Sequence, residues 1–240
     1  MLVLFDIDDT LLDHGAAERS AATFLYKSVG ASVPLEEFLV KWAAALERHF
    51  ARYLTGEVSY QGQRRDRMRE MVDSSLSDET ADLIFAGYLA SYEASWSLFS
   101  DVLPCLDSLA QHRLGVISNG QGVQQRRKLA QTGIVDRFEC VVISEECGCA
   151  KPDPTIFLRA CAEAGELPAN SVYVGDRYDL DAQAARTAGL RGIWLDRKEG
   201  VTAEHVSPII RSLDRLGALL IGAKTLPNKA LQLTPGSGRG

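Results

Sequence analysis

The chain lacks several features by which whole classes of protein are recognised. It has no long run of Lys and Arg, and its formal net charge is −6, so we expect no nucleic-acid polymer as a partner, because phosphate backbones bind clustered basic side chains. No apolar run approaches the roughly 20 residues that a membrane span needs. No basic leader precedes the apolar residues at the N-terminus, as a signal peptide would require. We therefore predict a cytoplasmic protein without a membrane partner.

Histidine and cysteine are too few and too scattered to predict a metal site built from these residue types. The five cysteines show no Cys-x-x-Cys spacing and have no histidine beside them, so zinc is not expected. An odd number of cysteines favours a reducing compartment. We interpret the four histidines as structural; they are His14, His49, His112 and His205.

The sequence does contain short apolar runs that alternate with helical patterns. Each run is bounded by turn or polar residues and is typical of a buried parallel strand. Helical patterns lie between the later runs, at 123–131, 155–164 and 181–188, and this alternation favours a doubly wound α/β sheet. The predicted strands are 2–5, 114–117, 141–143, 172–174 and 192–195.

A long interval separates the first predicted strand from the second. It holds about a hundred residues, far more than one crossover helix requires. Residues 16–96 are rich in Ala, Leu, Glu and Arg with apolar positions at helical spacing, which predicts an α-helical cap inserted into the sheet domain. We therefore assign 1–15 and 97–222 to the core and 16–96 to the cap. Residues 223–240 mix Pro, Gly, Ser and Lys, and we expect a disordered tail there.

Polar groups follow the apolar runs at the points where strands end. Asp6 and Asp8 follow the first run and, being two residues apart, point to the same side of an extended backbone. Carboxyl ends of parallel strands meet at one edge of a sheet, so groups after different strands are expected to converge there. The later groups are Ser118, Asn119 and Gly120, then Lys151, then Asp176 and Asp181.

This set of side chains fits phosphoryl transfer. A carboxylate can attack phosphorus while a neighbouring acid protonates the leaving oxygen and later activates water, so Asp6 is the candidate nucleophile and Asp8 the candidate acid and base. Mg²⁺ prefers oxygen ligands, and we expect Asp6 and Asp176 to bind it. Lys151 would offset charge on Asp6 and the phosphate. The phosphate oxygens would be held by Ser118 and by N–H groups of the turn that contains Asn119 and Gly120.

The segments "DIDDT", "VISNG", "AKPDP" and "GDRYDLD" occur in the order of the four motifs of the haloacid dehalogenase superfamily, which this sequence resembles over nearly its whole predicted ordered length. The resemblance implies a Rossmann-like core, Mg²⁺ and the roles just given. It adds Asp181 and the backbone carbonyl of Asp8 to the metal site. Thr10 matches the threonine that orders the acid/base loop, and we group it with the substrate-binding residues. "VISEECGCAKPDPTIF" is most similar to pyrimidine 5′-nucleotidase-like and N-acylneuraminate phosphatase-like members.

The leading prediction is thus a Mg²⁺-dependent phosphatase acting on a small phosphorylated metabolite, a nucleotide or sugar phosphate, through an aspartyl-phosphate intermediate. A 2-haloacid dehalogenase would need Asp6 but not Asp8, because halide leaves without a proton. A phosphomutase would use both acids, and a non-catalytic binding protein would need neither. The sequence leaves open whether the protein is a monomer or a dimer.

Two features of the sequence have alternative interpretations. Four arginines at 64, 65, 67 and 69 form either a basic patch that meets a nucleotide or acidic sugar, or a solvated helix face, and the second interpretation is favoured. Arg177 stands where the superfamily has a small residue after the motif aspartate, and it could reach a substrate group.

Overall fold

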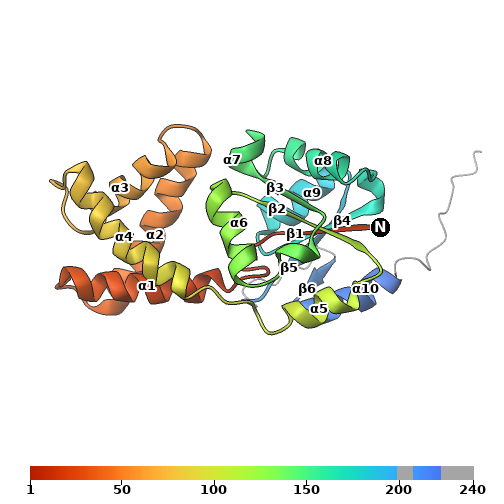
Figure 1. The fold of residues 1–240 in the computed structure, drawn as a ribbon, viewed down its shortest axis with the longest axis horizontal. Helices are drawn as coiled ribbons and strands as arrows, with labels where there is room; N and C mark the ends of the chain where they lie inside the picture. Colours follow the sequence, from red (N-terminus) through yellow and green to blue (C-terminus); the bar gives the residue numbers. More distant parts are fainter. Residues whose placement is uncertain (199–207, 223–240) are drawn as a thin grey trace, which may run out of the picture.

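The computed structural model describes residues 1–198 and 208–222, and these form a sheet-containing lobe and a helical lobe (Figure 1). The sheet is parallel, with the order β3-β2-β1-β4-β5-β6. The five predicted strands are confirmed to within one residue at each end, whereas the two-residue edge strand β6 was missed. The strands are β1 (Leu2–Phe5), β2 (Arg113–Ser118), β3 (Cys140–Ile143), β4 (Ser171–Gly175), β5 (Arg191–Leu195) and β6 (Ile209–Ile210).

Helices cover both faces of the sheet, which explains why its central strand is wholly apolar. Alternate side chains of β1 point to opposite faces, so that Val3 and Phe5 pack in one core cluster while Leu2 and Leu4 pack in another. The first cluster receives side chains from α5 (Val102–Ser108), α6 (Gly122–Gln131) and α10 (Leu216–Gly222). The second receives them from α8 (Pro154–Glu163) and α9 (Ala184–Thr187). The predicted Rossmann-like α/β fold is confirmed.

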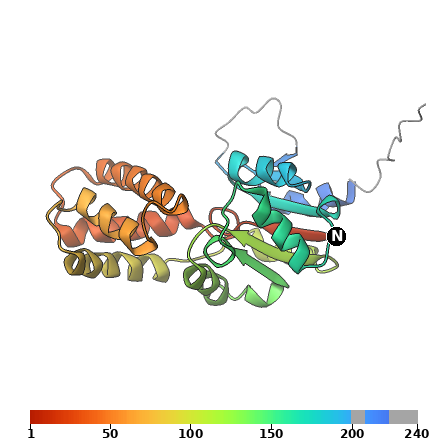
Figure 2. The ribbon, with the colours of Figure 1, turned by 90° about the horizontal axis from the view of Figure 1, so that it is seen from above.

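The insertion between β1 and β2 is helical, as predicted. Side chains of Asp13, Ser59 and Ser77 cap the first turns of three of its helices, and Gly30 ends the first helix in the left-handed conformation at φ 63°. Figure 2 shows the four helices together, beyond the carboxyl end of the sheet. They are α1 (His14–Val29), α2 (Leu35–Leu54), α3 (Tyr60–Met71) and α4 (Asp78–Ala94).

The segment after β4 differs from the ordinary α-helix expected at 181–188. Residues Tyr178–Gln183 form a π-helix, which α9 continues. A Cβ at Gly175 would lie 2.4 Å from the carboxyl carbon of Asp181, and one at Gly192 would lie 1.9 Å from the carbonyl oxygen of Ala182. The two glycines therefore allow this turn to pack directly on β4 and β5.

Helix α8 begins at the Asp153-Pro154 pair. Asp153 accepts a hydrogen bond from the Thr155 N–H and so caps α8, with Pro154 at its first position. The short helix α7 (Ser144–Cys147) follows β3.

The predicted tail at 223–240 lies outside the described residues. Among the helices that the structure describes, none combines the length and apolarity needed to cross a bilayer.

Candidate active site

Residues from four separate strand ends line one cavity of about 1020 Å³ between the sheet and the cap helices. Thr10 is not among the lining residues. It is fully buried, and its hydroxyl has no hydrogen-bond partner among the described residues, while its carbonyl accepts a bond from Arg197. The predicted residues that line the cavity are Asp6, Asp8, Ser118, Asn119, Gly120, Lys151, Asp176 and Asp181.

Lys151 is the centre of a buried hydrogen-bond network. Its Nζ donates to Asp6 Oδ1 at 2.7 Å, to Asp181 Oδ1 at 2.7 Å and to the Tyr173 hydroxyl at 2.9 Å. Burial acts to lower the pKa of Lys151, but the two carboxylates outweigh it and raise the pKa. Lys151 therefore stays charged and holds the candidate nucleophile in a fixed position.

The carboxylates around Lys151 form a group suited to a divalent cation. Oxygen atoms of Asp6, Asp176 and Asp181 lie within 4.8 Å of one another. Burial and the neighbouring acids raise the pKa of Asp6 to about 7 and that of Asp176 to about 8. Three acids this close together repel one another when all are ionised, and a divalent cation such as Mg²⁺, which prefers oxygen ligands, would stabilise their ionised forms. Asp181 already accepts bonds on both oxygens, from Lys151 and from the Arg177 N–H at 2.9 Å.

Asp8 has a separate set of partners. Lys128 Nζ lies 2.6 Å and 2.8 Å from its two carboxylate oxygens, and Gln125 donates to Oδ2 at 3.0 Å. His14 Nδ1 lies 3.8 Å from Oδ1 and 2.7 Å from the Tyr92 hydroxyl. Burial acts to raise the pKa of Asp8, but Lys128 and His14 reverse the shift and lower the pKa to about 2. Asp8 is therefore ionised at neutral pH in the ligand-free protein.

The turn after β2 uses its polar groups mainly to hold the site together. Asn119 exchanges two hydrogen bonds with the backbone of Lys151, at 2.8 and 3.0 Å. The Gly120 N–H donates to Ser144 Oγ at 2.9 Å, so a role for it in phosphate binding requires this bond to break. Ser118 Oγ accepts from Gln125 at 2.6 Å and lines the cavity, where it can meet a phosphate oxygen.

The sequence analysis missed Lys128 and Gln125, although both touch the predicted residues. They lie three positions apart in the helix that follows the "VISNG" turn. The apolar residue Leu129, four positions after Gln125, lies on the same buried side of this helix. This spacing on one face of the helix is a usable signal. His14, interpreted as structural, also belongs to the surroundings of Asp8. A single histidine offers no comparable pattern.

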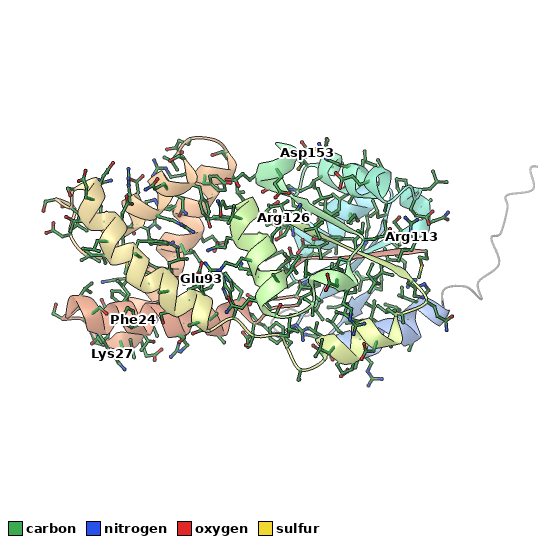
Figure 3. The ribbon with its side chains drawn as sticks, in the orientation of Figure 1. Phe24, Lys27, Glu93, Arg113, Arg126 and Asp153 are labelled. Atoms are coloured by element: carbon green, nitrogen blue, oxygen red, sulfur yellow. The ribbon has the colours of Figure 1, made fainter. Side chains whose placement is uncertain are left out.

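The cap and core are joined near the cavity by side chains from both. Figure 3 shows Glu93, on α4, facing α6. Its carboxylate pairs with Arg127 at 2.7 Å, and its carbonyl accepts from Gln131 at 2.8 Å. Exposed Arg177 lies 3.3 Å from Glu47 of α2. The superfamily's small residue is thus replaced here by one that reaches the cap.

The favoured interpretation of the four cap arginines is wrong for two of them. Arg65 and Arg69 pair with acids of α4 at the outer side of α3, as a solvated face would. Arg64 and Arg67, by contrast, line the cavity, and Arg67 is only 2 % exposed.

The parallel sheet brings two aspartates, a buried lysine and a cluster of acids to one cavity under a helical cap. This arrangement fits a hydrolytic enzyme of the α/β class. The chain belongs to the haloacid dehalogenase-like hydrolase family, whose model matches residues 1–189. The family resemblance inferred from the four motifs is therefore confirmed.

Three curated relatives and one solved structure show what the chain is similar to. Glyceraldehyde 3-phosphate phosphatase from Methanopyrus kandleri is 32% identical over 78% of this chain and 80% of its own. Pyrimidine 5′-nucleotidase YjjG from Escherichia coli is 37% identical over 45% and 49%. Human N-acylneuraminate-9-phosphatase is 26% identical over 91% and 92%. The HAD-hydrolase YfnB from Bacillus subtilis, 21% identical, shares the fold with a TM-score of 0.79 over 92% of this chain and 98% of its own.

Proposed function

We propose that this protein is a Mg²⁺-dependent phosphatase that hydrolyses a small phosphomonoester through an aspartyl-phosphate on Asp6. The observation that carries the proposal is the pair of carboxylates, Asp6 and Asp8, which line the same cavity with separate lysine partners. The names of the relatives, which are phosphatases and a nucleotidase, support the same chemistry.

Mg²⁺ would be held by Asp6 and Asp176, with Asp181 and the Asp8 carbonyl as further ligands. When bound, it supplies positive charge that neutralises the carboxylates and the phosphate oxygens. The Asp6 carboxylate attacks phosphorus, and the bond to the leaving oxygen breaks as that oxygen takes a proton from Asp8. Asp8 then removes a proton from water, which attacks the phosphorus and releases phosphate and the free Asp6 carboxylate.

Asp8 must be protonated for the first step and ionised for the second. Its pairing with Lys128 favours the ionised form, and the negative phosphate group placed beside it acts in the opposite direction. Ser118 and Lys151 would hold phosphate oxygens. A dehalogenase remains the alternative, but it gives Asp8 no role, because halide needs no proton.

The experiment is to follow phosphate release from p-nitrophenyl phosphate and from a panel of natural phosphomonoesters. We expect turnover that requires Mg²⁺, stops with EDTA and falls to background in Asp6→Asn, and we expect phosphate on the peptide that contains Asp6. Release of halide from a 2-haloacid, with no phosphate release from any ester, would refute the proposal. The best substrate of the panel would identify the substrate class, whether a nucleoside monophosphate, a sugar phosphate or a three-carbon phosphate.

A further inference from the structure

Helix α3 presents one face to the cavity and another to the acids of α4, Asp78 and Asp82. Arg65 donates to Asp82 at 2.9 Å, and Arg69 donates to the carbonyl of Leu76 at 3.0 Å. The cavity-lining residues of the helix are spaced at i, i+3, i+4 and i+7, so they share the other face; they are Tyr60, Gln63, Arg64 and Arg67.

Among the described residues, Arg67 is a buried cation without a counter-ion in contact. Its side chain lies over the rings of Trp42 at 4.7 Å, Phe85 at 5.3 Å and Tyr88 at 5.6 Å. Within the described part of the chain, its Nε and Nη1 have no hydrogen-bond partner. A buried guanidinium with unmet donors costs several kcal/mol, so its retention at a cavity wall indicates that a ligand completes it.

Arg64 adds a second donor to the same wall. It stacks over Tyr60 at 4.1 Å and Phe85 at 4.7 Å, and its Nη2 donates to the Tyr60 hydroxyl at 2.9 Å. Its Nε is buried and unpaired among the described residues. That Tyr60 hydroxyl in turn donates to Gln124 of α6 at 2.6 Å. Aromatic rings therefore pack against both arginines at this end of the cavity, and Gln124 holds the Tyr60 hydroxyl beside Arg64.

The charge balance at this wall favours a ligand with one negative charge. Glu18 also lines the cavity and carries the charge opposite to that of Arg67. The two side chains form no ion pair within 4.0 Å, and Glu18 Oε1 is itself unpaired within the described residues. Two arginines against one glutamate leave one excess positive charge. Apolar side chains, among them Leu46, Phe50 and Leu89, line the same cavity.

We propose that Arg67, assisted by Arg64, binds a carboxylate at the end of the substrate remote from its phosphate. The inference rests on the proposed phosphatase function and specifies its substrate class, a phosphomonoester with an apolar middle and a terminal carboxylate. A planar carboxylate matches the fork of guanidinium donors. The cavity of about 1020 Å³ is large enough for such a molecule to span the acids and the arginines.

The test compares ω-phosphooxyalkanoates of three to eight carbons with the matching ω-phosphooxyalkanols. At the best chain length, we expect kcat/KM to be roughly 10- to 100-fold higher for the acid, since a hydrogen bond to a charged group is worth about 1.5–3 kcal/mol. In Arg67→Met this preference should fall to about 2-fold or less, while hydrolysis of p-nitrophenyl phosphate persists. Arg67→Lys, which keeps the charge but not the fork, should lie between the two. Arg65→Gln, on the outer face of the same helix, should retain the full preference.

Three results would overturn the carboxylate assignment. The first is an equal kcat/KM for acid and alkanol at every chain length, and the second is a preference for the acid that survives in Arg67→Met. The third is a stronger preference for an alkane bisphosphate than for the acid. If the parent hydrolyses no phosphate ester, the phosphatase proposal fails. Thermal unfolding with plain alkanoates then tests separately whether Arg67 binds a carboxylate. An alkanoate that raises the Tm of the parent but not of Arg67→Met would support the site; no rise, or an equal rise in both, would reject it. If Arg67→Met does not fold, Arg64→Met and Arg67→Lys are compared with the parent in the same assays.

Discussion

Lys128 and Asp8 form a charge pair that joins α6 to the loop after β1, with both carboxylate oxygens within 2.8 Å of Nζ. The lysine side chain is only 3% exposed, against 28% for the aspartate. Such a pair fixes the direction in which Asp8 faces the cavity. Lys128 is therefore a candidate positioning residue for the proposed acid and base.

Replacing Lys128 should affect turnover more than substrate binding. We expect Lys128→Met to lower kcat about 10- to 100-fold, a part of what general acid–base catalysis contributes, with a smaller change in KM. Steady-state kinetics on an alkyl phosphate measures both. Arg126→Gln, which alters an exposed residue of the same helix that pairs with Glu146 of the core, is the control. A loss confined to KM would instead make Lys128 a substrate-binding residue.

Asp8→Asn should separate the two steps of the proposed reaction. An aryl ester expels a good leaving group and can phosphorylate Asp6 without a proton, whereas hydrolysis of the aspartyl-phosphate still needs a base. We therefore expect a burst of p-nitrophenol followed by slow turnover, and a more severe loss with alkyl phosphates. Rapid-quench mass spectrometry would detect phosphate on the peptide that contains Asp6. Normal steady-state turnover of alkyl phosphates by the variant would contradict the assigned role.

Asp176→Asn should weaken Mg²⁺ binding without destabilising the metal-free protein. The substitution replaces an acid that lies close to Asp6 and Asp181 and whose pKa is raised by burial and by these two acids to about 8, so the Tm without Mg²⁺ should equal or exceed that of the parent. Added Mg²⁺ should raise the parent Tm, because it binds the folded state, and should raise that of the variant less. Differential scanning calorimetry measures both, with exposed Asp179→Asn as the control. An equal rise in the two proteins would remove Asp176 from the ligand set.

Asp101→Ala should destabilise the core. Asp101 accepts bonds from two nitrogens of Arg197 at 2.8 and 2.9 Å, and from Ser212 Oγ and the Leu213 N–H, each at 2.9 Å. Its loss leaves buried donors unpaired, at a cost of about 2–4 kcal/mol in the free energy of unfolding. Urea unfolding at neutral pH measures this cost. The exposed Asp107→Ala should lie within about 0.5 kcal/mol of the parent.

The contribution of Asp101 should also depend on pH. Burial acts to raise its pKa, but the bonds from Arg197, Leu213 and Ser212 lower the pKa below 3.8. A carboxyl group whose pKa is lowered by folding stabilises the protein above the unfolded-state value, and that stability is lost as the pH falls through the lowered pKa. The difference between parent and Asp101→Ala should therefore shrink in acid. A difference that stays constant down to pH 2 would show that the charge of Asp101 is not responsible.

The strands and the motif residues could be predicted because local patterns specify them. Apolar runs such as Leu2–Phe5 are buried on both faces whichever helices cover them, and chain direction alone brings Asp6, Ser118, Lys151 and Asp176 to one edge of a parallel sheet. The π-helix at Tyr178–Gln183 was not predictable in this way, because it depends on the close approach of the Asp181 side chain to Gly175 and of the Ala182 backbone to Gly192.

The sequence by itself determined the α/β core, the helical nature of the insertion and the acids of the candidate site, since each follows from a period or a spacing along the chain. Tertiary structure alone decided which arginines of α3 face the cavity. That helix is polar on nearly every side, so no apolar stripe marks its inner face, and only packing against Trp42, Phe85 and Tyr88 buries Arg67 while Arg65 stays with its acids. The contact of Lys128 with Asp8 likewise forms only in the folded protein, because the two residues lie far apart in the sequence and the helical spacing gives the face of α6 but not its partner.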